Sequence, residues 1–199
     1  MNFFAHLVLA KPTVQSRVGN LLGDFARGVD IQTLPEAVFE GLMNHRRVDQ
    51  FTDQHPEVIQ LKRYFSTQRR RFSGIALDVL FDHFMLKHWQ QFSHVPLDQV
   101  IEALYEDLIM GQSLMPARMQ QVTQRLVDTD WFRAYQQLDG VAYALDRIAG
   151  RIRFRHEFNG IGEELTLHYP QLEAGFSVFF IDLCDRFPSP LIDSGKRER

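Results

Sequence analysis

The sequence predicts an all-α fold, a single globular domain of about eight or nine helices. Three observations support this prediction. Apolar residues recur at the helical period in most segments, and no stretch alternates apolar and polar residues over a convincing strand length. The chain of 199 residues, 45% of them hydrophobic, is long enough for one well-buried core and short for two.

Helix boundaries follow from the residues that flank each apolar period. Thr33, with Glu36 three residues later, has the spacing of a capping box, and Ser73-Gly74 interrupts the pattern between two helices. Ten candidate helical segments, the first a short helix or a helical turn, cover residues 3–10, 13–28, 33–52, 57–71, 75–91, 97–110, 115–127, 131–138, 140–152 and 170–187. The last is apolar nearly all round and is expected to lie centrally in the core. Because the tail 188–199 is polar and proline-rich, it is predicted to be disordered, and the domain to span residues 1–187.

The composition excludes several functional classes. A formal net charge of −3 argues against a protein that binds nucleic acid by neutralising phosphates. The single Cys184 excludes an intrachain disulfide framework, and its apolar surroundings predict an inert core thiol in a reducing compartment. The N-terminal segment has no basic residue before its apolar run, and no run approaches the roughly 18 apolar residues that span a bilayer. We therefore expect a soluble cytoplasmic protein that binds neither nucleic acid nor membrane.

Two predicted helices carry the strongest functional signal. Their acidic and histidine side chains recur every four residues, which places them along one helix face. These residues are His45, Asp49 and Asp53 in the first helix, and Asp78 and Asp82, with the adjacent His83, in the second. Carboxylates this close repel one another, and both segments are too apolar to be fully solvated. A positive group is expected between them, and a divalent metal ion is the obvious candidate.

Candidate metal ligands concentrate in the first ninety residues. The full set is His6, Asp24, His45, Asp49, Asp53, His55, Asp78, Asp82 and His83. Mixed histidine and carboxylate ligands favour manganese, iron, zinc or magnesium over calcium, which prefers oxygen ligands alone. With several carboxylates, manganese or magnesium would suit phosphate-ester chemistry, because the ion polarises a phosphoryl oxygen and lowers the pKa of a bound water.

Each candidate also has a purely structural explanation. His6 can be a hydrogen-bonded core histidine, and Asp24 can cap a turn. His45 and Asp49 can form a solvated ion-pair face with nearby arginines, worth a few tenths of a kcal/mol. The neighbouring pair Asp82 and His83 is the hardest to explain in this way, because its apolar surroundings demand buried partners.

A group of basic residues accompanies these segments. Its members are Lys62, Arg63, Arg69, Arg70 and Arg71, with Arg27, Arg46 and Arg47 upstream. Two interpretations remain open at this point. The group is either an ordinary solubilising surface or a docking surface for an acidic partner or a phosphate.

Four sequence blocks follow one another in the first half of the chain. They are MNFFAHLVLA at the start, GNLLGDFARG at 19–28, GLMNHRRVDQFTDQHP at 41–56 and ALDVLFDHFMLKHW at 76–89. In order and spacing these blocks resemble the acyl carrier protein phosphodiesterase family. The second half is similar to the family mainly in length and helical character.

The resemblance implies a fold, a reaction and a cofactor. The fold would be all-helical and distantly related to the HD-type metal-dependent phosphohydrolases. The reaction would belong to fatty acid and lipid metabolism: hydrolysis of the phosphodiester that joins 4′-phosphopantetheine to the serine of holo acyl carrier protein, giving the apo protein and free phosphopantetheine. Manganese is the implied metal, with Mg²⁺ or Fe²⁺ as alternatives.

The resemblance also suggests roles for individual residues. The HD-type families use a His-Asp doublet, which this chain lacks; it has Asp82-His83 in reversed order. Matched by block, the expected metal ligands are Asp24, His45, Asp82 and His83, with His6 next. Asp49 or Asp78 would orient the ligands or accept a proton, Arg46 or Arg27 would contact the non-bridging oxygens, and Arg69, Arg70 and Arg71 would dock the acidic carrier protein, with Arg27 as a further partner-binding residue.

Two other functions stay open at the level of sequence. A metal-dependent enzyme of the HD type could act on a nucleotide or another small phosphate ester. Alternatively, the chain could be a non-catalytic helical module that binds an acidic partner and uses its polar residues structurally.

Overall fold

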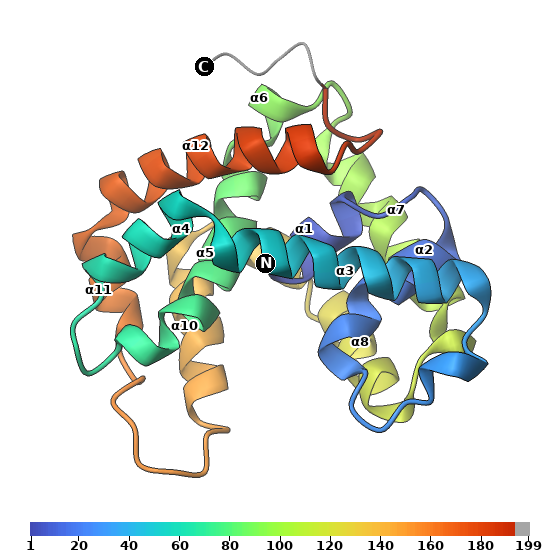
Figure 1. Cartoon of the computed structure of the whole chain (residues 1–199), viewed down its shortest axis with the longest axis horizontal. Helices are drawn as coiled ribbons and strands as arrows, with labels where there is room; N and C mark the ends of the chain where they lie inside the picture. The colour runs from blue at the N-terminus through green and yellow to red at the C-terminus, as the bar shows by residue number, and fades with distance from the viewer. Residues whose placement is uncertain (194–199) are drawn as a thin grey trace.

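The computed structural model describes residues 1–193, in which helices and their connections form the whole fold and no β-strand occurs (Figure 1). The α-helices are α1 (Phe3–Val8), α2 (Val14–Leu22), α3 (Glu36–Gln54), α4 (Pro56–Leu61), α5 (Ser73–Lys87), α6 (Trp89–Phe92), α7 (Leu97–Met110), α8 (Ala117–Asp128), α9 (Trp131–Ala134), α10 (Leu138–Ala149), α11 (Ile161–Leu167) and α12 (Tyr169–Arg186). Five 3-10 helices accompany them: η1 (Gly23–Phe25), η2 (Ile31–Thr33), η3 (Lys62–Tyr64), η4 (Arg70–Phe72) and η5 (Gln112–Leu114). The all-α prediction is confirmed. The number of helices exceeds eight or nine because some predicted helices are split and α11 was not predicted.

The final helix buries one face in the core and exposes the other, so it is not surrounded by the core as predicted. Helix α12 packs against α4 and α5 and runs along the upper side of the molecule in Figure 1. Phe176 and Phe179 of α12 contact Phe81 of α5, with ring centroids 5.4 and 5.2 Å apart. The helix is not buried all round, since Val178 is 53% exposed. Cys184 is buried, in agreement with its prediction as a core thiol.

Two glycines allow α2 and α3 to pack at close range. A Cβ atom added to Gly19 would lie 2.1 Å from the carbonyl oxygen of Val38, and one added to Gly41 would lie 2.5 Å from that of Ser16. Any larger residue at either position would force the two backbones apart. This crossing fixes the face of α3 that carries the predicted ligands.

The predicted helix over residues 57–71 is broken. Helix α4 ends at Leu61, and the chain continues through η3 and η4 before α5 begins at Ser73. Tertiary contacts explain the break: the amide of Ser66 donates to the Glu164 carboxylate, and Arg69 binds the same residue. These contacts stabilise an irregular connection over a continuous helix.

Thr33 does not cap a helix, which contradicts the predicted capping box. It lies in η2, where its hydroxyl donates to the carbonyl of Asp30. Pro35 occupies the N-cap position of α3 instead. Proline has no backbone N–H, and the N-cap position of a helix does not require one.

The first part of the tail packs against the domain, contrary to the prediction of disorder over 188–199. Ile192 is buried, and the Ser189 hydroxyl donates to the carbonyl of Val8. The amide of Asp193 donates to the carbonyl of Phe92 at 2.7 Å. An apolar side chain and two tertiary hydrogen bonds therefore outweigh the polar composition of this segment. Residues 194–199 lie outside the described residues.

Across residues 1–193, no helix combines the length and the apolarity that crossing a bilayer requires.

Candidate metal centre

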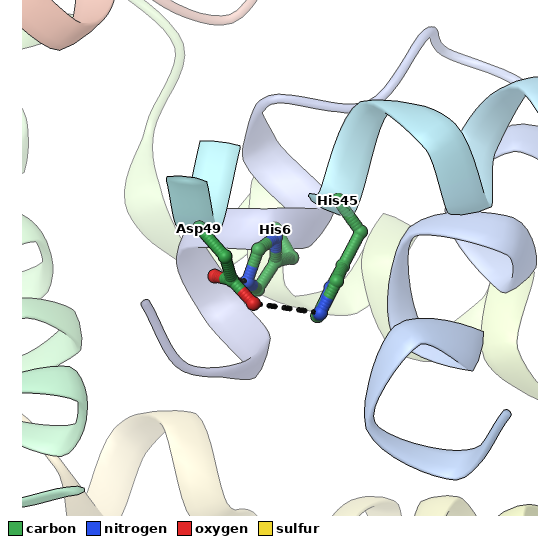
Figure 2. A group of neighbouring side chains, drawn as sticks. All are labelled: His6, His45 and Asp49. Atoms are coloured by element: carbon green, nitrogen blue, oxygen red, sulfur yellow. Dashed lines mark hydrogen bonds and ion pairs between the residues drawn. The ribbon is translucent and has the colours of Figure 1, made fainter. Parts of the chain in front are cut away.

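Three of the predicted residues converge from two helices: His6 of α1, and His45 and Asp49 of α3 (Figure 2). His6 Nε2 lies 3.1 Å from Asp49 Oδ1, and His45 Nε2 lies 3.0 Å from Asp49 Oδ2. The two imidazole rings stack with their centroids 3.9 Å apart. Each residue offers one ligand atom, and these atoms lie within 4.8 Å of one another. One carboxylate therefore faces both imidazoles at the spacing of a cation site.

Local structure explains how His45 reaches this position. His45 and Asp49 are four residues apart on α3, so their side chains lie on one face. The imidazole of His45 passes so close to Gly23 that a Cβ atom there would lie 2.0 Å from His45 Cδ2. Gly23 thus creates the space for His45. The sequence offered a signal for this, since Gly19 and Gly23 are one helical turn apart in the GNLLGDFARG block.

The electrostatics of the cluster favour a neutral imidazole beside a charged carboxylate. Burial lowers the pKa of His6 to about 3, despite its hydrogen bond to Asp49. Burial alone would raise the pKa of Asp49, but hydrogen bonds from His45 and His6, with the Met1 amino group, hold this pKa far below its usual range. At neutral pH the cluster thus contains an anionic oxygen donor and a His6 nitrogen lone pair, the donor types that transition metals bind.

Two further carboxylates extend the cluster. The Met1 amino group lies 2.8 Å from Asp78 Oδ1 and 3.5 Å from Asp49 Oδ1, which links these two acids. Burial opposes the charge of this amino group, but Asp78 and Asp49 raise its pKa to about 10. Loss of hydration raises the pKa of Asp24 to about 6. The charge of His45 lowers this pKa, and the charge of Asp49 raises it. Asp24 and Asp78 therefore border the cluster.

Asp82, a predicted ligand, instead stabilises helix α1. It is fully buried, and its two carboxylate oxygens accept hydrogen bonds from the amides of Phe4 and Ala5 at 2.9 and 3.0 Å. These amides belong to the first turn of α1, where no intrahelical acceptor exists. Burial raises the pKa of Asp82 to about 7 against the effect of these two bonds. Asp82 thus holds the helix that carries His6, and its acceptor atoms are already used.

His83 is likewise separate from the cluster. Its Nδ1 lies 2.7 Å from the carbonyl oxygen of Tyr135, and its Nε2 lies 2.7 Å from the Tyr169 hydroxyl. A neutral ring that donates from Nδ1 and accepts at Nε2 satisfies both contacts. Both nitrogens that a metal could use are therefore engaged. The buried partners that the sequence demanded exist, and they are protein groups.

The remaining candidates in this part of the chain are paired elsewhere. Asp53, in line with His45 and Asp49 on α3, is 71% exposed and binds Lys62. His55 caps α4 through Nδ1 and contacts Asp182 through Nε2 at 3.2 Å. Neither side chain belongs to the cluster of His6, His45 and Asp49.

The arginines predicted near the site do not all face it. Arg46 follows His45 by one residue and therefore points about 100° away on the helix; its guanidinium contacts Met43 Sδ at 3.9 Å. Arg27 is exposed beyond η1. A contact of either residue with His6, His45 or Asp49 is not found within residues 1–193.

The predicted docking arginines are used to hold the fold together. Arg69 donates to the carbonyls of Glu157 and Asn159 and pairs with Glu164 at 3.1 Å. Arg71 lies over the rings of Phe72 and Phe154, and Arg70 donates to the carbonyl of Phe65. Since Arg69 and Arg71 are bound to their own chain, this segment is a poor docking surface.

The residues present fit a divalent cation. The Nδ1 atoms of His6 and His45 are buried and have no hydrogen-bond partner within the described part of the chain. A proton on Nε2 leaves Nδ1 as an unsatisfied acceptor, and a proton on Nδ1 leaves an unsatisfied donor while the Nε2 lone pair faces the Asp49 anion. A cation bound by the two Nε2 atoms and Asp49 would remove the repulsion between the Nε2 lone pairs and the Asp49 anion in the second tautomer. Two imidazoles and one carboxylate suit manganese, iron or zinc better than calcium.

A cavity of about 550 Å³ adjoins the acidic side of the cluster. Met1, Asp24 and Asp78 belong to its lining, together with residues of α8, α9 and α10. The cluster is thus beside a space large enough for a small-molecule ligand or a flexible arm.

Comparison with known proteins places this arrangement in a family. The sequence model described as acyl carrier protein phosphodiesterase matches residues 1–183. The chain belongs to the acyl carrier protein phosphodiesterase family. The match covers the cluster and the helices around the cavity, and so extends beyond the four blocks of the first half.

Several relatives carry the family name. The acyl carrier protein phosphodiesterase of Enterobacter sp. (strain 638) is 35% identical over 181 residues, which cover 90% of this chain and 94% of the relative. Those of Pectobacterium atrosepticum and Yersinia pestis are each 36% identical with the same coverage. No solved structure matches the chain, so the distant relation to HD-type enzymes stays a prediction.

Proposed function

We propose that this protein hydrolyses the phosphodiester between 4′-phosphopantetheine and the serine of holo acyl carrier protein, and that it requires a divalent cation held by His6, His45 and Asp49. The names of its relatives support the substrate. The convergence of these three side chains supports the cation. Manganese is our first choice, because the donor set combines imidazole with carboxylate and the reaction is that of a phosphate ester.

The reaction consumes one water molecule. The water oxygen bonds to phosphorus, the bond between phosphorus and the serine oxygen breaks, and the serine oxygen takes up a proton. The products are apo acyl carrier protein and free 4′-phosphopantetheine. A bound divalent cation supplies Lewis acidity toward a phosphoryl oxygen and a lower pKa of water.

The carboxylates of the site have distinct roles in this proposal. Asp49 orients both imidazoles, because its two oxygens each face one Nε2 atom. Asp24 serves as an additional ligand from the cavity side, where its charge is coupled to His45 and Asp49. Asp78, which is 42% exposed and lines the same cavity, accepts the proton of the attacking water in this proposal.

The observation that carries the proposal is the contact of one carboxylate with two buried histidines beside a cavity. The test is mass spectrometry of holo acyl carrier protein after incubation with the protein, with Mn²⁺ or with chelator. We expect conversion to the apo mass only with metal, and none with the His45→Gln variant. His94→Gln is the matched control, because His94 is 71% exposed and pairs with Asp193 far from the cluster in sequence.

Other outcomes would replace the proposal. Turnover of nucleotides or other small phosphate esters, with holo acyl carrier protein untouched, would assign the site to a phosphohydrolase of the HD type. Folded protein that binds no metal and converts no ester would indicate a non-catalytic binding module.

A further inference from the structure

The cavity beside the cluster has an uneven distribution of charge. Asp24 of η1 and Asp78 of α5 contribute its acidic lining, whereas arginines line it from segments further along the chain. These arginines are Arg118 and Arg125 of α8, Arg147 of α10 and Arg151 just beyond it. In Figure 1, α8 and α10 lie on opposite sides below the N-terminus. The lining thus combines carboxylates that border the cluster of His6, His45 and Asp49 with positive charge from other elements.

The four arginines point into the same cavity because of their helical spacing. Arg118 and Arg125 are seven residues apart, which is two turns of α8, and Arg147 and Arg151 are four residues apart. All four are exposed, and within residues 1–193 none forms a side-chain hydrogen bond or an ion pair. Four like charges around one space repel one another unless an anion lies between them.

Other arginines of the chain show what a structural arginine looks like here. Arg133, close to Trp131 of the cavity wall, binds Asp98, Glu102 and Asp130. Arg69 binds Glu164 and two backbone carbonyls. Within residues 1–193, these structural arginines are held by carboxylates and carbonyls, whereas the cavity arginines have no such partner; Arg147 contacts only the ring of Tyr143, at 6.0 Å.

The remaining walls suit an elongated, mostly uncharged arm. Phe3, Phe25, Trp131 and Tyr143 contribute aromatic surface. A volume of about 550 Å³ falls within the roughly 300–1,000 Å³ typical of ligand pockets, so it accepts an arm and not a folded protein. A protein that carries such an arm must therefore stay outside the cavity, where the four exposed arginines are accessible to it.

We propose that this cavity is the entry site for the substrate arm, and that Arg118, Arg125, Arg147 and Arg151 dock the acidic surface of the protein that carries it. The inference rests on the proposed function for the identity of that partner. The phosphodiester lies at the Asp24 and Asp78 end, and the carrier protein contacts α8 and α10. The docking surface is therefore formed by these helices and not by the segment 62–71.

Binding measured without turnover tests the inference. Holo acyl carrier protein is titrated into the protein in the presence of chelator, and binding is measured by calorimetry or fluorescence anisotropy. We compare wild type with Arg118→Gln/Arg125→Gln and Arg147→Gln/Arg151→Gln. Each double variant should weaken binding by roughly tenfold or more, and should show a shallower loss of affinity with added salt than wild type. Circular dichroism and melting temperature establish that each variant is folded.

The matched control removes two exposed arginines from the competing surface, as Arg63→Gln/Arg70→Gln. Its affinity should equal that of wild type. A result in which the control loses affinity while both cavity variants keep it would overturn the inference.

A second readout separates this inference from the proposed function. In the cavity variants, KM for holo acyl carrier protein should rise by a larger factor than KM for bis(p-nitrophenyl) phosphate, a small diester with no protein attached. Wild type that converts the carrier protein, with cavity variants of unchanged affinity and KM, would leave the proposed function intact and overturn the docking site. Wild type that binds holo acyl carrier protein without converting it, with binding lost in the cavity variants, would support the docking site and reject the proposed function.

Discussion

Two histidine and aspartate groups lie close to helix α1, and they differ in what their side chains contact. In the group of His6, His45 and Asp49, the side chains face one another and leave two buried Nδ1 atoms without partners. In the pair Asp82 and His83, all four heteroatoms of the side chains have hydrogen-bond partners from the protein. The first group brings three ligand atoms within 4.8 Å of one another, whereas no such group within residues 1–193 includes Asp82 or His83. Apolar neighbours in the sequence therefore do not distinguish a metal site from a structural pair. The hydrogen-bond partners of the side chains distinguish them.

The largest effect in this comparison is expected from His45→Gln. Removal of a ligand should abolish cation binding, and a cation supplies several kcal/mol to the transition state, so kcat should fall by about 10³-fold or more. The measurement is the initial rate of apo acyl carrier protein formation at saturating Mn²⁺. His88→Gln, which removes a histidine that pairs with Glu173, is the control and should keep its rate within about threefold. Equal rates in the two variants would contradict the assignment of the site.

Gly23→Ala should lower activity without removing any ligand. The added Cβ atom would lie 2.0 Å from His45 Cδ2, and the ring stacked on His6 limits how far His45 can move. Displacement of a ligand by about 1 Å can reduce the rate roughly 10²-fold. Steady-state kinetics with a Mn²⁺ titration should show weaker metal activation. Gly74→Ala is the control, because a Cβ atom there meets no neighbour. An unchanged Mn²⁺ requirement in Gly23→Ala would show that His45 is not a ligand.

Asp82→Asn should affect stability more than metal binding. The amide keeps one acceptor oxygen, so one buried amide of Phe4 or Ala5 loses its partner, at a cost of about 1–3 kcal/mol in the free energy of unfolding. Urea denaturation measures this change. The folded variant should still bind one equivalent of Mn²⁺, and complete loss of metal from folded Asp82→Asn would move the site to Asp82.

The smallest effect concerns pH. Burial, with Lys87 and His88, lowers the pKa of His83 below 6.5 in the folded state, against the opposing effects of the Tyr135 carbonyl and Glu173. Below pH 6.5 the unfolded chain binds a proton at this residue that the folded chain binds less readily, so stability falls as pH falls. In His83→Gln this contribution is absent, and the loss of stability between pH 7 and pH 5 should be smaller than in wild type. The measurement is the free energy of unfolding of both proteins at each pH. If it changes equally with pH in the two proteins, His83 does not titrate in this way.

Much of the fold was predictable from sequence because local pattern determines it. The long helices α3, α7, α8 and α12 follow their apolar periods and boundary residues. The breaks at 62–72 were not predictable, because they depend on Ser66 and Arg69 contacting a segment about ninety residues away. The packing of Ile192 and Ser189 is long-range in the same sense.

The site shows the same limit. The four-residue spacing correctly brought His45 and Asp49 to one face, and His6 was among the candidates. The spacing could not reveal that Asp82 would bind the amides of α1 or that His83 would meet Tyr135 and Tyr169, because those partners come from other parts of the chain. Nor could it identify the arginines that line the cavity, because the elements that bring them together are distant in sequence from Asp24 and Asp78.

The most direct test of the central claim is a Mn²⁺ titration, followed by electron paramagnetic resonance, of wild type, His45→Gln and His83→Gln at the same protein concentration. If the cation is held by His6, His45 and Asp49, wild type and His83→Gln should each bind one ion. Binding in His45→Gln should be at least about 10²-fold weaker. The opposite pattern, with metal retained in His45→Gln and lost in folded His83→Gln, would contradict the claim and return the site to the Asp82 and His83 pair.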